Sequence, residues 1–275
     1  MIKDIAVSLS VGVPRDVAAE YAISVAEAFG AHLAGIAFAY EPVVPSSVMG
    51  GISVDFIDAQ RAESTRRAKE AMARFDEATR RAGLSAESRL IGATLADAAS
   101  EFAAIARRFD LSVVAQAQGG KLAPEELMIE AALFDSGRPV IVVPYVQKAP
   151  MKLDTTLVCW DGSRTAARAI ADAMPLLARA KTVQVVIIAT ERAKSDEVPG
   201  ADLGQHLARH GLKIDVKRIV SGLDVPNAIL SHAADVSADF IVMGGYGHSR
   251  LREFVLGGAT RGILASMTAP VLMSH

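Results

Sequence analysis

The sequence DFIVMGGYG at residues 239–247 decides the fold of this chain, because it joins a buried strand to a glycine-rich turn. The apolar and partly β-branched run 239–243 is typical of a strand inside a sheet, and this strand is expected to end at Gly244. In open parallel α/β sheets, ligands bind at the carboxyl ends of the strands, and glycine lets a phosphate approach the main chain. The stretch therefore indicates an α/β fold with a nucleotide site at this turn.

A second pair of glycines, Gly257 and Gly258, follows Gly247 after nine further residues. The segment Ala259–Met267 behind them is expected to form a helix, whose free N–H groups and dipole would face an anion. Together with the first turn, this spacing makes nucleotide binding the leading hypothesis.

Length and composition set limits on the fold and on the partners. A chain of 275 residues suits two domains, and its apolar residues with few aromatics predict cores of Ala, Val, Leu and Ile. With a formal net charge of -2, the chain lacks the excess of positive charge that is typical of nucleic-acid-binding proteins, so nucleic acid is not an expected partner. No apolar run is long enough to cross a membrane. The single cysteine, Cys159, and the absence of a signal peptide predict a cytoplasmic protein.

The two halves of the chain repeat one unit. Ile5–Leu9 corresponds to Thr156–Trp160, 110–114 to 239–243, and Pro139 to Pro270. Each copy alternates five candidate strands with four helical stretches, which predicts parallel pairing. We expect two tandem α/β domains, residues 1–147 and 153–275, each with a doubly wound parallel sheet, joined by a linker at 146–152. The last strand of each copy follows a proline and is expected at a sheet edge, where it can pair with its counterpart.

The offset between the copies falls from 151 at the first strand to about 130 later, so the first copy carries about twenty extra residues. They are expected as an apolar loop at residues 41–62, between the second strand and the next helix. Packing onto its own domain is the default interpretation of this loop. Covering a pocket or docking a partner are the alternatives.

These residues resemble the universal stress proteins, whose nucleotide signature is Gly, two residues, Gly, nine residues, Gly, then Ser or Thr. Gly244, Gly247 and Gly257 match this spacing, whereas Gly258 stands at the hydroxyl position. Glycine keeps the backbone N–H there and removes a side-chain donor. The resemblance implies Rossmann-like sheets of the adenine nucleotide alpha hydrolase type, with the two copies packed as a pseudo-dimer. A homodimer is a further alternative.

The resemblance also implies the residues of the site and their ligand. In the second copy, Asp161 would hydrogen-bond the nucleoside, Gly162 would allow a tight turn, and Ile188 would lie where the family places backbone against adenine. The start of the last helix would contribute Gly258, Ala259 and Thr260. The implied ligand is ATP, or ADP or AMP, with or without Mg²⁺. The implied role is a stress-response binding or signalling module.

Other features bear on enzymatic activity. No Walker motif is present, and we expect no catalytic residues, no metal ligands and at most slow ATP hydrolysis. His206 and His210 have helical spacing but lack a third ligand, so a surface helix is the better interpretation. A scaffold protein that binds no nucleotide is the alternative, since Asp161 can serve as a turn former and the glycines as a tight turn.

The first copy lacks the signature. Ser10 lies in the strand-end segment that holds Asp161 in the second copy, and Gln116 is expected at the place of Gly244. The run 130–134 is expected where the phosphate cradle would be. We therefore expect nucleotide binding in the second copy alone.

Overall fold

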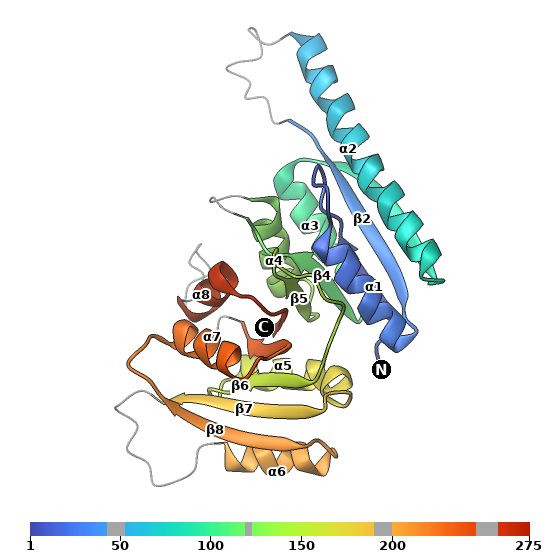
Figure 1. Ribbon diagram of the computed structural model, residues 1–275. Helices are drawn as coiled ribbons and strands as arrows, with labels where there is room; N and C mark the ends of the chain where they lie inside the picture. Colours follow the sequence, from blue (N-terminus) through green and yellow to red (C-terminus); the bar gives the residue numbers. More distant parts are fainter. Residues whose placement is uncertain (43–52, 119–122, 190–199, 246–257) are drawn as a thin grey trace. The chain divides into compact units, whose positions relative to one another are not determined.

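The computed structural model describes residues 1–42, 53–118, 123–189, 200–245 and 258–275. The chain divides into two compact units, Met1–Arg138 and Pro139–His275, each built from strands and helices in alternation (Figure 1). This architecture confirms the predicted α/β fold class. Among the helices that the structure describes, none has the length and apolar character needed to cross a membrane.

The first unit holds a parallel sheet with strand order β3-β2-β1-β4. Its elements are β1 (Asp4–Ser8), α1 (Val17–Phe29), β2 (His32–Tyr40), α2 (Val54–Arg81), β3 (Ala86–Ala93), α3 (Leu95–Ala106), β4 (Leu111–Ala115) and α4 (Pro124–Asp135). Strand β2 is buried at every position between its two ends, because helices cover both faces of the sheet (Figure 1). Its continuous apolar sequence is therefore the pattern of a central parallel strand.

The second unit holds a sheet with strand order β5-β10-β9-β6-β7-β8. Its elements are β5 (Val140–Val143), β6 (Thr155–Cys159), α5 (Arg164–Leu177), β7 (Thr182–Ala189), α6 (Ala201–Arg209), β8 (Ile214–Val220), α7 (Val225–Asp235), β9 (Phe240–Gly244), α8 (Gly258–Ser266) and β10 (Val271–Ser274). Strand β5 pairs antiparallel with β10, and Val142 lies opposite Val271. These are the two proline-preceded strands whose pairing was predicted. The irregular connection 144–154 lies inside this unit, so the domain boundary near residue 150 stays a prediction.

Repeated hydrogen bonds identify equivalent positions in the two units. The carboxylate of Asp110 accepts from the backbone N–H groups of Lys3 and Asp4, at 2.6 and 3.1 Å. Asp239 binds the start of β6 in the same way, at 2.9 Å from each of two amides. Asp110 stands one residue before β4 and links it to β1, and Asp239 stands one residue before β9 and links it to β6. The alignment they define places Ser10 at Asp161 and Ala115 at Gly244. The expectation that Gln116 replaces Gly244 was wrong by one residue, since Gln116 aligns with Gly245.

The extra residues of the first copy lie in a helix. Helix α2 has 28 residues, whereas its counterpart α6 has nine. The preceding connections differ little, with residues 41–53 in the first unit and 190–200 in the second. The expectation of an apolar loop at 41–62 was therefore wrong for its second part, because Val54, Phe56 and Ile57 belong to the first turn of α2. Residues 43–52 of the expected loop lie outside the described part of the chain.

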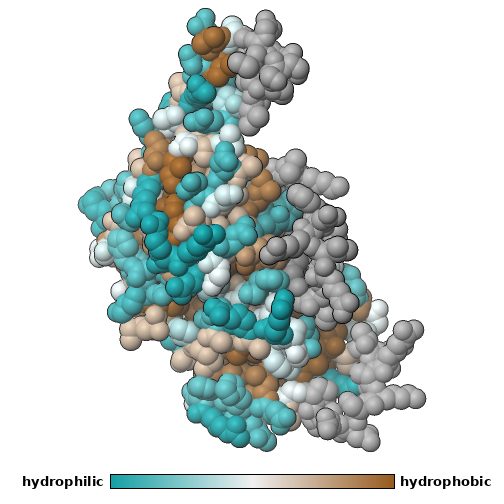
Figure 2. Space-filling view, turned by 180° about the vertical axis from the view of Figure 1, so that it is seen from behind, coloured by the Kyte–Doolittle hydropathy of each residue, from teal (hydrophilic) through white to brown (hydrophobic). Residues whose placement is uncertain are grey.

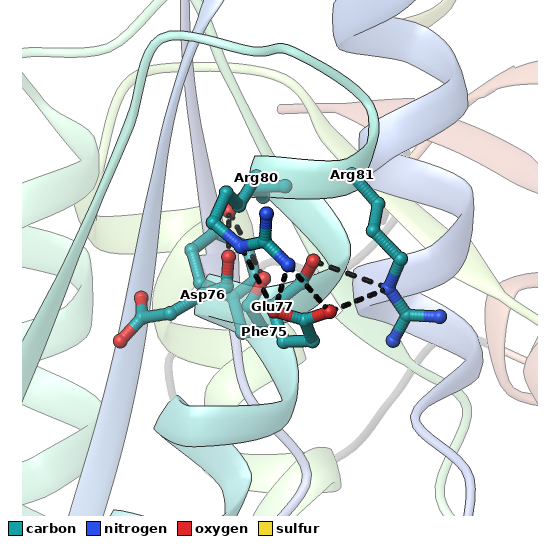
Figure 3. Close-up of polar contacts among 6 residues, drawn as sticks. Phe75, Asp76, Glu77, Arg80 and Arg81 are labelled. Carbon is teal, nitrogen blue, oxygen red and sulfur yellow. Dashed lines mark hydrogen bonds and ion pairs between the residues drawn. The ribbon is translucent and has the colours of Figure 1, made fainter.

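Helix α2 packs on the sheet through its second half only. Its buried residues are Ala68, Ala71, Phe75 and Thr79. A side chain on Gly35 of β2 would lie 2.8 Å from the Phe75 ring, so glycine is needed at this crossing. The exposed face carries ion pairs, such as those of Glu77 with Arg80 and Arg81 in Figure 3. The hydrogen bond from Arg80 lowers the pKa of Glu77. The first turn exposes Val54 and Phe56, and Figure 2 has hydrophobic surface at this end of the unit.

Candidate functional site

The chain reverses its direction of travel across the second sheet between β6 and β9. From β6 it continues to β7 and β8 on one side, and it then returns to form β9 and β10 on the other. These neighbouring strands are parallel, so their carboxyl ends share one edge of the sheet. Open α/β sheets bind ligands in the crevice at such a reversal. The residues that follow β6 and β9 are therefore the candidate site.

The turn after β6 is built by Asp161, Gly162 and Ser163. The Ser163 amide donates to Asp161 Oδ1 at 2.9 Å, and Gly162 has a φ of 77°, which side chains disfavour. Ser163 Oγ accepts from the Ala166 amide at 3.1 Å and so caps α5. Asp161 is exposed at the strand end. The structure thus assigns Asp161 a role as a turn former and presents its carboxylate at the edge of the crevice.

Gly244 has a packing role that the sequence did not reveal. A Cβ on this residue would lie 2.5 Å from the Ala166 amide nitrogen and 2.6 Å from the Thr165 carbonyl carbon. Both are backbone atoms at the start of α5, so they cannot turn aside as a side chain could. Glycine here lets the N-terminus of α5 lie directly against the end of β9. Thr165, which is 2% exposed, is the contact residue that sequence reasoning missed.

Helix α8 begins at Gly258 and leads through four residues into the start of β10. Its N-terminus therefore points toward the carboxyl edge of the sheet. A Cβ on Gly258 would meet no atom of the described residues within 4 Å, so these residues leave the space beside the first turn open. Ala259 is half-buried, and Thr260 is 3% exposed. Thr260 therefore does not offer an accessible hydroxyl in place of the one that Gly258 lacks.

Ile188 lies at the end of β7, opposite Ile219 of β8, and is half-buried. Its strand end shares the edge with Asp161, Gly162 and Gly244. The other two predicted glycines, Gly247 and Gly257, lie outside the described residues. The described site residues thus come from the ends of three adjacent strands and from the start of one helix.

Comparison with known proteins agrees with this architecture. The universal stress protein family profile matches residues 152–275. Residues 152–275 belong to the universal stress protein family. A universal stress protein of Synechocystis is 32% identical over 89 residues, which are 31% of this chain and 30% of the relative. The chain thus matches about a third of that curated relative's length.

Two solved structures resemble the whole chain. The structure of a universal stress protein from Archaeoglobus fulgidus has a TM-score of 0.72 at 16% identity, covering 98% of this chain and 95% of its own. A functionally unknown protein from Pseudomonas aeruginosa has a TM-score of 0.65 at 16% identity, covering 99% and 92%. These likenesses show that the tandem fold extends over both units.

The first unit departs from the universal stress protein signature at the equivalent edge. Asp16 caps α1 and accepts from the amides of Ser10 and Ala19, at 2.7 and 3.0 Å. A carboxylate is therefore present near this strand end, but it is turned onto the backbone, and burial raises its pKa. Ala115 replaces Gly244. Phe38 replaces Ile188 and stacks on Tyr40 with ring centroids 6.4 Å apart.

The start of α4 differs most from the start of α8. Helix α4 opens with Pro124, which has no N–H, and continues with Glu125 and Glu126 in its first turn. Carboxylates at this position satisfy the helix dipole and repel a phosphate. The expectation that residues 130–134 occupy the place of the cradle was wrong, because they lie well inside α4.

Two further sequence features have a structural explanation. The sulfur of Cys159 is surrounded by protein although the residue is half-buried overall, and this desolvation, with the charge of Asp161, raises its pKa to about 12. The thiol is therefore protonated and unreactive at neutral pH. The rings of His206 and His210 meet edge to face, 4.8 Å apart. The described residues contain no cluster of three His, Cys, Asp or Glu suited to a metal ion.

Proposed function

We propose that the second unit binds an adenine nucleotide, ATP or else ADP or AMP, and that the protein works as a cytoplasmic stress-response binding or signalling module. The open space beside Gly258 at the start of α8 carries this proposal. A helix N-terminus offers unpaired N–H groups and positive potential, and no side chain of the described residues blocks a phosphate from reaching them here. The acidic start of α4 offers the opposite environment.

The residues present fit such a ligand. Asp161 is exposed at the strand end and can accept hydrogen bonds from the hydroxyls of a ribose. Ile188 supplies an apolar surface for the base. The amides of Gly258 and Ala259 would bind phosphate oxygens. Gly247 and Gly257 are included in the site because their spacing in the sequence matches the family signature. Mg²⁺, if it accompanies ATP, would neutralise phosphate charge.

One nucleotide per chain is expected. At the equivalent place in the first unit, the described residues leave a cavity of only about 40 Å³. Ligand pockets in proteins measure about 300 to 1,000 Å³. Tyr40, Pro124, Glu125 and Met128 are among the residues that narrow this space.

The alternative is a scaffold that binds no nucleotide. Two observations favour it: Gly258 has no hydroxyl, and the buried Thr260 does not replace one. Gly244 is also explained by packing alone. Slow ATP hydrolysis is a third candidate and would need an added base or metal ion.

Extraction of the purified protein, followed by mass spectrometry of the released small molecules, separates the first two functions. About one ATP, ADP or AMP per chain supports the proposal. An empty protein that also fails to bind added ATP in calorimetry would leave the scaffold function. Turnover of ATP with magnesium would favour the hydrolase.

Replacing Gly258 by serine is expected to tighten ATP binding about fivefold, a gain of about 1 kcal/mol. The space that the described residues leave open accommodates the side chain, and Gly258 is the first residue of α8, where serine is readily tolerated. The added hydroxyl then restores the donor of the family signature. Calorimetric titration of the wild type and the variant measures the difference. A large loss of affinity would mean that phosphate occupies the space of the side chain itself.

A further inference from the structure

The chain leaves β9 at Gly245, and the end of β10 holds both the amide and the carbonyl group of this residue. The Gly245 amide donates to the Ser274 carbonyl oxygen at 2.8 Å. The imidazole of His275 bonds through Nδ1 to the Gly245 carbonyl oxygen, 3.2 Å away. Gly244, the preceding residue, is the register partner of Ser274 in the adjoining parallel strand. The first residues of the nucleotide signature are therefore held by β10 as well as by α5.

The partner of His275 determines which ring nitrogen carries hydrogen. A carbonyl oxygen only accepts hydrogen bonds, so Nδ1 must be the donor. The ring therefore has its hydrogen on Nδ1 when it is neutral and on both nitrogens when it is charged. A neutral histidine in water favours the other tautomer, with the hydrogen on Nε2. The contact with Gly245 thus gives the ring a property that can be measured in solution.

The first unit has different residues at the equivalent strand end. Strands β5 and β10 have four residues each and both follow a proline directly, so Val143 corresponds to Ser274 and Pro144 to His275. Neither of these apolar side chains can donate a hydrogen bond. The unit that lacks the nucleotide signature therefore also lacks the imidazole at this place.

Ser274 indicates that the end of β10 is not optimised for packing alone. The residue is 2% exposed, and its hydroxyl has no hydrogen-bond partner among the described residues. Val143, at the same place in the first unit, is fully buried and brings no polar side-chain atom. Burying an unpaired hydroxyl is unfavourable, whereas burying a valine is favourable. A local cost of this kind is typical of functional sites.

We propose that His275 is a positioning residue of the nucleotide site, an inference that rests on the function proposed above. Its Nδ1–H holds the carbonyl of Gly245 and so fixes the backbone where the chain leaves β9 for the glycines of the signature. Groups that are fixed before a ligand arrives need less ordering when it binds, and this raises the affinity. His275 thus acts on the phosphates through Gly245.

The contact is tested first without nucleotide, by NMR of isotope-labelled full-length protein. Long-range nitrogen–proton spectra of the imidazole rings are expected to show the hydrogen of His275 on Nδ1 when the ring is neutral. Exchange of the Gly245 amide with deuterium is expected to be about fivefold faster in His275→Ala than in the wild type. A neutral ring with its hydrogen on Nε2, or equal exchange rates, would overturn the proposal.

Calorimetric titration with ATP then measures the effect on binding. His275→Ala is expected to weaken the affinity about fivefold. His275→Asn should restore it, because the asparagine Nδ2–H lies where the imidazole Nδ1–H does. His275→Gln carries the same amide one bond farther out and should not restore it. The matched control is His210→Ala, which removes an exposed imidazole at the end of α6 and should leave the affinity unchanged.

The outcomes separate this proposal from the proposed function. A wild-type protein that binds no ATP would refute the nucleotide site, while the exchange rate of Gly245 would still decide whether His275 holds the backbone there. Equal affinities of the wild type and His275→Ala would overturn the positioning role and leave the nucleotide site intact. Equal losses in the alanine and asparagine variants would also overturn it, because the ring would then act by packing rather than as a donor.

Discussion

Replacing Gly244 by alanine is expected to destabilise the second unit by about 2–3 kcal/mol. The added methyl group would lie 2.5 Å from the Ala166 amide nitrogen and 2.6 Å from the Thr165 carbonyl carbon. Because both contacts are backbone atoms, the start of α5 must move away from β9. The midpoint of urea unfolding, followed by fluorescence of Trp160 in this unit, measures the loss.

Gly258→Ala is the matched control for this prediction. The same methyl group meets no atom of the described residues within 4 Å at the start of α8, so stability should stay the same or rise slightly. Measurements without nucleotide keep ligand effects out of the comparison. Equal stability of the two variants would mean that α5 and β9 are not in the contact described above.

Asp161→Asn is expected to weaken ATP binding by about 10- to 100-fold while leaving the fold intact. The asparagine oxygen can still accept from the Ser163 amide and keep the turn. The variant loses only the charge, and charge-assisted hydrogen bonds contribute about 1.5–3 kcal/mol. Calorimetric titration with ATP measures the affinity, and circular dichroism confirms the fold.

Asp154→Asn is the control for charge. Asp154 immediately precedes β6, whereas Asp161 follows it, so Asp154 lies at the amino ends of the strands, away from the candidate site. There it forms an ion pair with Lys181 at 2.6 Å. Exposed pairs of this kind contribute little to stability, so both fold and affinity should be unchanged. Equal effects of the two variants would indicate a general response to net charge and would remove Asp161 from the site.

The sequence predicted the α/β fold with mostly parallel strands because apolar runs and glycine turns are local signals. The pairing of β5 with β10 was also predictable, since a proline precedes each strand. The position of the insertion was not. A difference in offset counts the extra residues, but it cannot say whether they lengthen a loop or a helix. The first half of α2 is solvent-exposed and has no apolar periodicity that would have predicted a helix.

The candidate site was predictable in its residue types and less so in their roles. Asp161, Gly162 and Gly244 were chosen for a ligand, and the structure adds that they also build the turn and the α5 contact. Glu125 was not singled out, because a glutamate in the first turn of a helix is common.

By itself, the sequence determined the fold class, the repeat and the strand ends at which a ligand would bind, because these depend on the periodicity and spacing of neighbouring residues. Only the tertiary structure decided which glycine is required by packing and which helix start is open and which is acidic. These properties depend on distances between atoms far apart in the chain, and sequence spacing does not contain them.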